Sequence, residues 1–229
     1  LYQARKGKLW YIVQSGEVGP SYTEITNLAL SSDGHRAFYC GRVRRQWFVV
    51  WDEIGYGPYK KVDRVHWGRL SEHWATKVVQ HGRAAVLWDG KLSRDWESVR
   101  SWSIYPFSDG SDCVYVANAY NTQWYLASFA QGHQPVSDGV WDIEYHDDGH
   151  HIAYRVRSDD SDYWVIDGQK QPHYSYAPWF RWSPDGAHWA YWALDGEQLF
   201  LVTDTGRYAL PPGSSSCAIR WTIERTSCQ

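Results

Sequence analysis

A short turn that ends in glycine recurs along this chain, and an aromatic-rich run lies on each side of it. The pattern is fullest in RWSPDGAHWAYWA (181–193), where Pro184 fixes its own φ and Gly186 tolerates a positive φ. The flanking runs lack helical spacing and are rich in Trp and Tyr, which favours strands. We therefore expect a two-stranded hairpin around each turn.

The turns are spaced almost evenly, which indicates an internal repeat. Their glycines are Gly34, Gly110, Gly149 and Gly186. The separations are 76, 39 and 37 residues, so one turn is missing near position 71. There HWGRLSEHWATKVV (66–79) aligns with 181–193 at both Trp residues and at the His before the second, although the turn has changed. A sixth unit appears in IRWTIERTSCQ (219–229), whose Arg-Trp pair repeats the one that opens 181–193.

Other residue types keep the same register and complete a four-stranded unit. A tyrosine lies four residues into the second strand of four units, as Tyr39, Tyr115, Tyr154 and Tyr191. Third strands end at Asp52, Asp89 and Asp167, and an aromatic residue follows each of them seven positions later. A repeated unit of four strands in about 38 residues is typical of a β-propeller blade.

This repeat resembles the WD-like, TolB-type propeller repeat, whose blades carry a Ser-Pro-Asp-Gly hairpin between their first two strands. The resemblance covers nearly the whole chain, and the chain departs from the pattern at 68–71 and in the last unit. It implies a propeller fold. It implies no single function, because such blades occur in scaffolds, in transport partners and in accessory domains of peptidases.

We expect an all-β chain that folds as a single six-bladed propeller domain over residues 1–229. Six units of about 38 residues account for this length. Tyr2 precedes Trp10 by eight residues, as Tyr39 precedes Trp47, so the chain begins in a second strand and both termini close the sixth blade. The expected blades span about 27–62, 64–98, 102–137, 141–176 and 179–210, with the sixth at 217–229 plus 1–24.

The composition argues against several classes of protein. The net charge is −3, which argues against a general nucleic-acid binder, and no apolar run reaches the roughly 18 residues of a membrane helix. The mean hydropathy is −0.58. No phosphate-binding, zinc-protease, nucleophile-elbow or Cys-x-x-Cys motif occurs, so we expect neither a cofactor nor catalytic residues.

Histidines and carboxylates do not predict a metal site. One histidine follows a repeat turn in each of four units, as His35, His73, His150 and His188. This spacing spreads them around one rim of the ring, too far apart to share an ion. The SDDSD segment (158–162) has carboxylates like those of a calcium loop but lacks its glycine and its distal glutamate.

The cysteines and the absence of methionine bear on compartment and processing. Cys217 and Cys228 lie on the two arms of the last hairpin, where a disulfide would join them, whereas Cys40 and Cys113 fall two blades apart and should stay unpaired. A disulfide favours an extracytoplasmic location, periplasmic or secreted, although unpaired thiols also suit the cytoplasm. Without any methionine, the chain is expected to be a processed or trimmed one.

Polar and charged residues alternate with apolar ones on the expected innermost strands. Because such charges cannot be buried alone, they must line the central channel or pair between blades. The candidates are Arg64, His66, Tyr105, Asp142, Glu144, Trp179, Arg181 and Arg220. Pairing between blades, for example of Glu144 with Arg181, is the simplest structural account, because buried charges are usually partnered.

The loops at the side where the inner strands begin differ in charge, which favours a binding function. They place Lys6, Lys8, Arg42, Arg44 and Arg45 on blades six and one, and Asp159, Asp160 and Asp162 on blade four. Such a polarised face would orient a partner and speed its encounter. We therefore expect a non-catalytic scaffold that docks a protein partner, or a glycan, alone or within a larger assembly.

A glycoside hydrolase that acts on an acidic sugar is the alternative. Arg64, Arg181 and Arg220, with Tyr105 and Glu144, are similar to the arginine cluster and Tyr-Glu pair of six-bladed sialidases. Converging arginines bind a carboxylate well. However, the repeated turn is not the Ser-x-Asp-x-Gly-x-Thr-Trp box of those enzymes, and the loops leave little room for a substrate.

Overall fold

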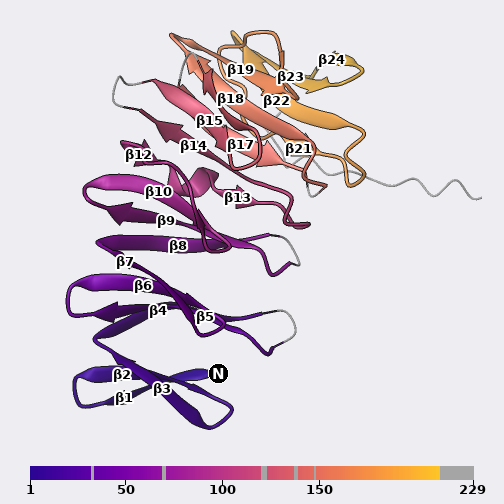
Figure 1. Cartoon of the computed structure of the whole chain (residues 1–229). Helices are drawn as coiled ribbons and strands as arrows, with labels where there is room; N and C mark the ends of the chain where they lie inside the picture. The colour runs from indigo at the N-terminus through magenta and orange to yellow at the C-terminus, as the bar shows by residue number, and fades with distance from the viewer. Residues whose placement is uncertain (32–33, 69–70, 120–122, 137–138, 147, 212–229) are drawn as a thin grey trace, which may run out of the picture. The chain divides into compact units, whose positions relative to one another are not determined.

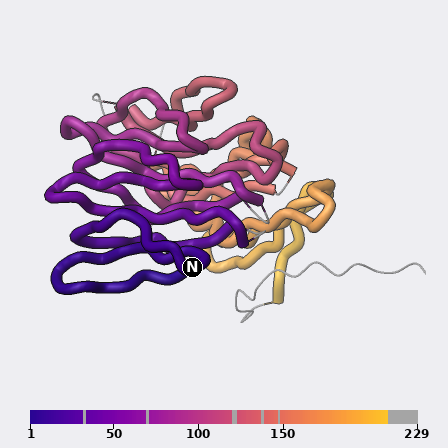
Figure 2. Tube along the Cα trace, turned by 60° about the horizontal axis from the view of Figure 1, so that its bottom comes forward, coloured from indigo at the N-terminus to yellow at the C-terminus, as the bar shows by residue number. Residues whose placement is uncertain are grey.

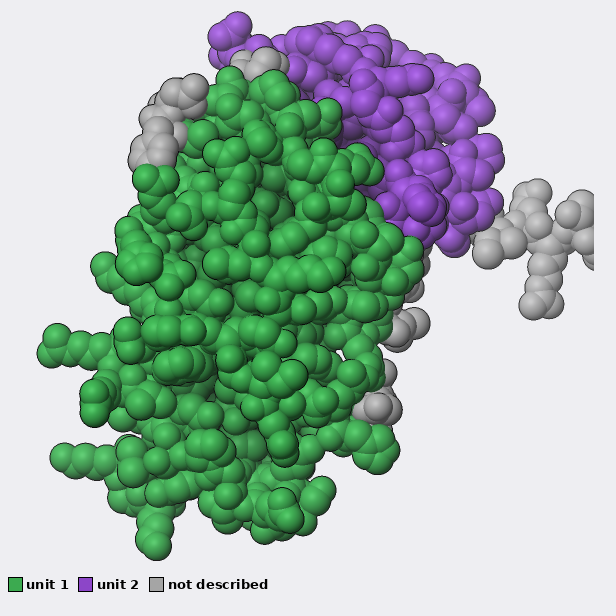
Figure 3. All heavy atoms as spheres, in the orientation of Figure 1, with its two compact units in different colours: residues 1–135 green, residues 136–229 purple. Residues whose placement is uncertain are grey.

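The computed structural model describes residues 1–31, 34–68, 71–119, 123–136, 139–146 and 148–211. These residues form 24 strands in six antiparallel sheets, and η1 (Ser101–Ser103) is the one 3₁₀ segment among them (Figure 1). The predicted all-β class is therefore confirmed. The chain divides into two compact units, Leu1–Pro135 and Val136–Gln229, which are described in turn (Figure 3).

The first unit holds four sheets that follow one another in chain order (Figures 1 and 2). The first sheet is β1 (Tyr2–Lys6), β2 (Leu9–Gln14) and β3 (Glu17–Tyr22), and the second is β4 (Glu24–Leu30), β5 (Ala37–Val43), β6 (Gln46–Trp51) and β7 (Ile54–Tyr59). The third is β8 (Lys61–Trp67), β9 (Trp74–Gln80), β10 (Arg83–Trp88) and β11 (Lys91–Leu92). The fourth is β12 (Ser98–Val99), β13 (Tyr105–Pro106), β14 (Cys113–Asn118), β15 (Trp124–Ser128) and β16 (Gly132–Val136).

The second unit holds two further sheets of four consecutive strands each. The fifth sheet is β17 (Gly139–Tyr145), β18 (Ile152–Ser158), β19 (Ser161–Ile166) and β20 (Gln169–Lys170). The sixth is β21 (Arg181–Trp182), β22 (Trp189–Asp195), β23 (Gln198–Thr203) and β24 (Gly206–Ala209).

Four of the six sheets have the predicted order of four consecutive strands. The first sheet has three described strands, and the inner strand predicted for it at 219–222 lies outside the described residues. So do Cys217, Arg220 and Cys228. In the fourth sheet η1 divides the expected inner strand into β12 and β13, and both pieces pair with β14.

The register of the first sheet repeats that of the second at an offset of 37 residues. Tyr2 faces Val13 across β1 and β2, and Tyr39 faces Val50 across β5 and β6. The strand that opens the chain is therefore equivalent to the second strand of the next sheet. This alignment was predicted from the sequence and is confirmed.

A six-residue turn joins the first two strands in the second to sixth sheets, and it explains the sequence repeat. In the sixth sheet the N–H of Gly186 donates to the carbonyl of Ser183 at 3.0 Å, and the N–H of Ser183 donates to the carbonyl of His188 at 2.9 Å. The same two bonds form in the turns that begin at Ser31, Gly68, Phe107 and His146. The third sheet thus keeps the hydrogen bonds of the turn although its sequence has lost the motif.

A side-chain bond, here termed the turn clip, ties the end of this turn to the end of the third strand. It joins two residues sixteen positions apart: His73 to Asp89 at 2.6 Å, His151 to Asp167 at 2.8 Å, and His188 to Asp204 at 2.7 Å. In the fourth sheet the roles are reversed, and the hydroxyl of Ser128 donates to Asp112 at 2.5 Å.

The turn clip corrects the predicted histidine column. The sequence alignment placed His150 beside His73 and His188, whereas the structure places His151 there. In the second sheet Arg36, not His35, ends the turn, and it pairs with Glu72 in the turn of the third sheet. The prediction failed because it took the first histidine after each turn, whereas the hydrogen bonds end every turn two residues after its glycine position.

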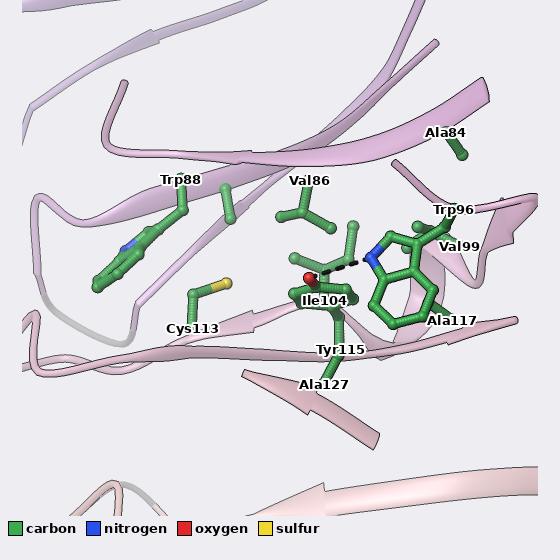
Figure 4. Close-up of a cluster of buried hydrophobic side chains, with 11 residues drawn as sticks. Ala84, Val86, Trp88, Trp96, Val99, Ile104, Cys113, Tyr115, Ala117 and Ala127 are labelled. Atoms are coloured by element: carbon green, nitrogen blue, oxygen red, sulfur yellow. Dashed lines mark hydrogen bonds between the residues drawn. The ribbon is translucent and has the colours of Figure 1, made fainter. Parts of the chain in front are cut away.

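The core lies between neighbouring sheets and is largely aromatic. Phe38 and Trp74 pack edge to face with ring centroids 5.1 Å apart, and Trp96 packs near Tyr115 in the next layer (Figure 4). The predicted tyrosine column is confirmed, since its four members are at most 8% exposed. The predicted absence of a bond between Cys40 and Cys113 is also confirmed, because both are buried and free.

Substitution of Gly41 tests how the first sheet packs on the second. The Tyr22 ring of β3 covers Gly41 of β5 so closely that an added Cβ would clash with it. We expect Gly41→Ala to lower the free energy of unfolding by about 1–3 kcal/mol, as overpacking of a core does. Gly55→Ala is the matched control, since a Cβ there meets no atom within 4 Å. Urea denaturation compares the two, and equal stabilities would contradict the packing described.

Candidate docking surface

Two hairpin turns of the first unit carry a cluster of positive charge. The β1–β2 turn contains Gly7 and Lys8, and the β5–β6 turn contains Arg44 and Arg45. Tight hairpin turns need positive φ, which Gly7 (63°) and Arg44 (59°) adopt. All four residues are exposed, so the charges of Lys8, Arg44 and Arg45 face solvent.

Each of these hairpins also holds an arginine over a tryptophan ring. The guanidinium of Arg5 lies 5.4 Å from the ring centroid of Trp10, and that of Arg42 lies 5.7 Å from Trp47. Arg42 is partly neutralised, since it binds Glu24 at 3.0 Å. Within the described part of the chain, Lys6, Lys8, Arg44 and Arg45 form no ion pair.

The turns of the two hairpins lie at the same end of the strands in neighbouring sheets. Tyr22 pairs with Trp10 next to the β1–β2 turn and packs on Gly41 of β5. The N–H and the hydroxyl of Thr23 both donate to the carbonyl of Arg42, at 2.8 and 3.0 Å. The predicted cluster is thus brought together, and we term it the basic rim: Lys6, Lys8, Arg42, Arg44 and Arg45.

A groove of about 670 Å³ separates the outer strands of the first and second sheets. At its floor the hydroxyls of Tyr22 and Tyr39 lie 3.2 Å apart. Burial, with a smaller effect of the Tyr22 hydroxyl, raises the pKa of Tyr39, so this phenol stays protonated at neutral pH. The apolar walls are open to solvent, since Val18 is 68% and Val43 is 41% exposed.

The groove is charged differently at its two ends. Val43 borders it directly before Arg44 of the basic rim. Glu17 and Glu53 line the groove beside the turns at the other ends of the strands, because consecutive turns of antiparallel strands alternate between the two ends. A bound segment would therefore meet positive charge at one end and negative charge at the other.

The two units differ in net charge as well. Residues 1–135 contain 16 Lys and Arg against 12 Asp and Glu, whereas residues 136–229 contain 7 against 14. The basic rim therefore belongs to a positively charged unit, although the whole chain carries −3.

The predicted acidic loop is only partly exposed. Asp159 and Asp160 form the β18–β19 turn and face solvent, but Asp162 is 0% exposed. The prediction that Asp162 contacts a partner is wrong, because its carboxylate binds Arg155 inside the fifth sheet at 2.6 Å. Arg155 in turn binds Asp142 at 2.7 Å, so Asp162 belongs to a buried ionic network.

The channel candidates of the first unit do not form a cluster of free charges. Arg64 is exposed on β8, and His66 and Tyr105 are half-buried on β8 and β13. Burial, and then the charge of Arg64, lower the pKa of His66 to about 4, so His66 is neutral at pH 7. A bulge between Val62 and Val65 breaks the strict alternation that the sequence argument assumed.

The channel candidates of the second unit are mostly paired. Glu144 accepts a hydrogen bond from Arg181 at 3.1 Å, which confirms the predicted pair. Burial raises the pKa of Glu144, against the opposing effect of Arg181. Asp142 is held by Arg155, as described above. Trp179 is 51% exposed, and its φ of 57° takes it out of regular strand geometry.

The groove itself was not predicted, although one sequence feature marked it. Gly41 stands where the equivalent strands have larger residues, namely Val78, Ala117, Val156 and Ala193. A glycine in a strand often marks close approach of another group, which here is the Tyr22 ring at the groove floor. The residues of the predicted charged loops lie next to the groove, but the groove itself depends on how two sheets meet.

Solved structures provide the similarities to known proteins. The chain is similar to a crystal structure of the eukaryotic initiation factor, with a TM-score of 0.55 and 12% identity, over 91% of this chain and 62% of that one. It also matches dihydro-heme d1 dehydrogenase NirN (TM-score 0.44, 12% identity, 89% of this chain and 53% of that one). A further match is the beta-propeller domain of Swd1 from Myceliophteria thermophila (TM-score 0.41, 9% identity, 93% and 88%).

The first of these similarities shows a shared fold alone, given its low identity. The chain spans just over half of NirN, at 53%, and 62% of the initiation factor. No protein-family model matches the sequence, and no curated protein matches it. The described residues contain no helix long and apolar enough to cross a bilayer.

Substitution of Asp162 tests whether its buried ionic network stabilises the fifth sheet. Asp162→Asn removes the charge that balances Arg155, and breaking a buried ion pair costs about 3–5 kcal/mol. We expect a loss of stability of that order. Asp160→Asn is the matched control in the adjoining turn, where a change of exposed charge alters stability by about 0.5 kcal/mol or less. If thermal denaturation gave both variants the same midpoint, the network around Asp162 would not stabilise the fifth sheet.

Proposed function

We propose that this chain is a six-bladed β-propeller that serves as a non-catalytic scaffold and docks a protein partner on the basic rim and the adjoining groove. Six antiparallel sheets, five of which share the six-residue turn, support the blade assignment. The sixth blade would combine β1–β3 with an inner strand at 219–222. The shared register of the first two sheets supports this closure, because β1 then corresponds to a strand that is paired on both sides.

The observation that carries the docking proposal is the basic rim beside an open apolar groove. Exposed like charges on neighbouring hairpins repel one another and contribute little to stability. They do raise the rate at which an oppositely charged partner arrives. The groove then offers apolar area that is exposed in the free chain, at Val18 and Val43.

The chemistry of the groove favours a protein segment over a glycan. Its walls include Val18, Val43 and Phe48, and burial of such side chains against apolar partner residues is what stabilises a protein interface. A segment with acidic residues followed by apolar ones would match the charge order of rim and groove. The carboxylates of Glu17 and Glu53 would favour a basic residue at its far end.

The hydrolase alternative has less support. Glu144 and Arg181 bind each other, so neither is free for a substrate in this arrangement. Arg64 and Tyr105 belong to the first unit, Arg181 and Glu144 belong to the second, and Arg220 lies outside the described residues. Neither unit by itself assembles the arginine cluster. The extracytoplasmic location and the terminal disulfide stay predictions.

Charge reversal of the rim tests the docking proposal. In Arg44→Glu with Arg45→Glu, partner association should slow by about tenfold or more at low salt, because the steering charge is inverted. The control is Lys91→Glu with Lys170→Glu, which changes the net charge equally at exposed positions on other sheets. Partners isolated from the native source on the wild-type chain would be measured for association rate against each variant.

Both variants should keep the wild-type melting temperature, since exposed charges contribute little to stability. The wild-type association rate should also fall as salt rises. Partner binding that the rim reversal leaves unchanged would overturn the docking proposal.

A further inference from the structure

A second cavity, of about 270 Å³, lies between the outer strands of the third and fourth sheets. Its walls come from the segment after β11 and from β14, β15 and β16. The aromatic part consists of Trp96, Tyr115 and Phe129, and the polar part includes Arg94 and His133. Neither the basic rim nor the docking groove shares a residue with this cavity.

Arg94 brings a positive charge to the mouth of the cavity. Its guanidinium lies 4.5 Å from the ring centroid of Trp96, and its NH1 lies 3.3 Å from Nε2 of His133. Among the described residues no Asp or Glu forms an ion pair with Arg94. Four of the five guanidinium N–H donors are therefore left for other acceptors.

His133 contacts Arg94 at the mouth of the cavity. A guanidinium has no acceptor, so NH1 of Arg94 is the donor in this contact with Nε2 of His133. Its ring packs against Trp96 and Tyr125, at centroid distances of 5.6 and 5.2 Å, which holds it in place at the mouth.

The inner wall of the cavity combines aromatic rings with the hydroxyl groups of Ser93, Tyr115 and Ser128. The indole N–H of Trp96 donates to the Tyr115 hydroxyl at 3.2 Å, so the donor of the indole is already used (Figure 4). Both residues are nearly fully buried. Phe129 packs against Tyr115 with ring centroids 6.1 Å apart. Phe129 is the half-buried aromatic ring of this lining, and Arg94 places a cationic fork at the entrance.

We propose that this cavity binds an organic carboxylate with a small apolar body. Arg94 would bind the carboxylate through two parallel N–H donors, and the body would pack on Phe129. Arg94 is the one lysine or arginine in the described lining, which suits a singly charged anion better than a phosphate dianion. The docking groove cannot do the same, since its described lining holds Glu17 and Glu53 and no cation.

Phenylacetate and its uncharged isostere phenylacetamide are suitable probes for the full chain. Titration calorimetry should show saturable binding of phenylacetate, with binding of phenylacetamide weaker by about tenfold or more, since charged hydrogen bonds add most to affinity. Arg94→Gln should weaken phenylacetate binding by about 10- to 100-fold. Arg94→Lys should give an intermediate loss, because lysine keeps the charge without the fork.

Lys91→Gln is the matched control. Lys91 belongs to the third sheet, lies over the ring of Trp88 and does not line the cavity. The melting curve of each variant would show that the chain is folded. A tripeptide ending in Phe, with a free or an amidated C-terminus, distinguishes the source of the carboxylate. If the free-acid tripeptide binds more tightly than phenylacetate, the ligand's carboxylate is the C-terminus of a peptide chain. If the tripeptide does not bind, the ligand is a small free acid.

Three results would overturn the proposal. One is that neither phenylacetate nor the free-acid tripeptide saturates the wild-type chain at about 10 mM, an affinity too weak for a specific site. Another is equal binding of phenylacetate and phenylacetamide. The third is that Lys91→Gln weakens binding as much as Arg94→Gln does.

Discussion

In four of the sheets, a bond between the last residue of the six-residue turn and the residue sixteen positions later fixes how three strands align. In the third, fifth and sixth sheets it joins a histidine to an aspartate, at 2.6–2.8 Å. Side chains alternate between the two faces of a strand, so a slip by one residue would turn the buried aromatic residues outward. The clip prevents such a slip at one end of the sheet, and the packing between sheets depends on it.

The opposite ends of the strands are free of this constraint, and two of the turns there carry pairs of like charges. Two-residue turns such as Arg44–Arg45 and Asp159–Asp160 carry residues that contact nothing essential to the sheet. One end of the first unit is thus specified by the clips, while the other can vary in charge without loss of stability. Such an arrangement suits the proposed scaffold, since rigid strands then hold the loops that would contact a partner.

Sequence patterns predicted what repeats and missed what occurs once. The tyrosine column and the Glu144–Arg181 pair follow from periodicity and from the need to partner buried charge, and both are confirmed. Asp162 was misassigned because its neighbours Asp159 and Asp160 are exposed, and only strand pairing shows that β19 has begun at that point. The two cavities depend on how far neighbouring sheets lie apart, which no periodic pattern records.

Closure of the ring is the central claim, and hydrogen exchange of β1 tests it most directly. In the complete chain the amides of Tyr2–Lys6 should be protected on both edges of the strand, by β2 and by the proposed inner strand at 219–222. In a chain that ends at Pro211 their exchange should become at least about tenfold faster, while β14 in the fourth sheet stays unchanged. Equal exchange of β1 in the two chains would contradict a sixth blade built from both ends.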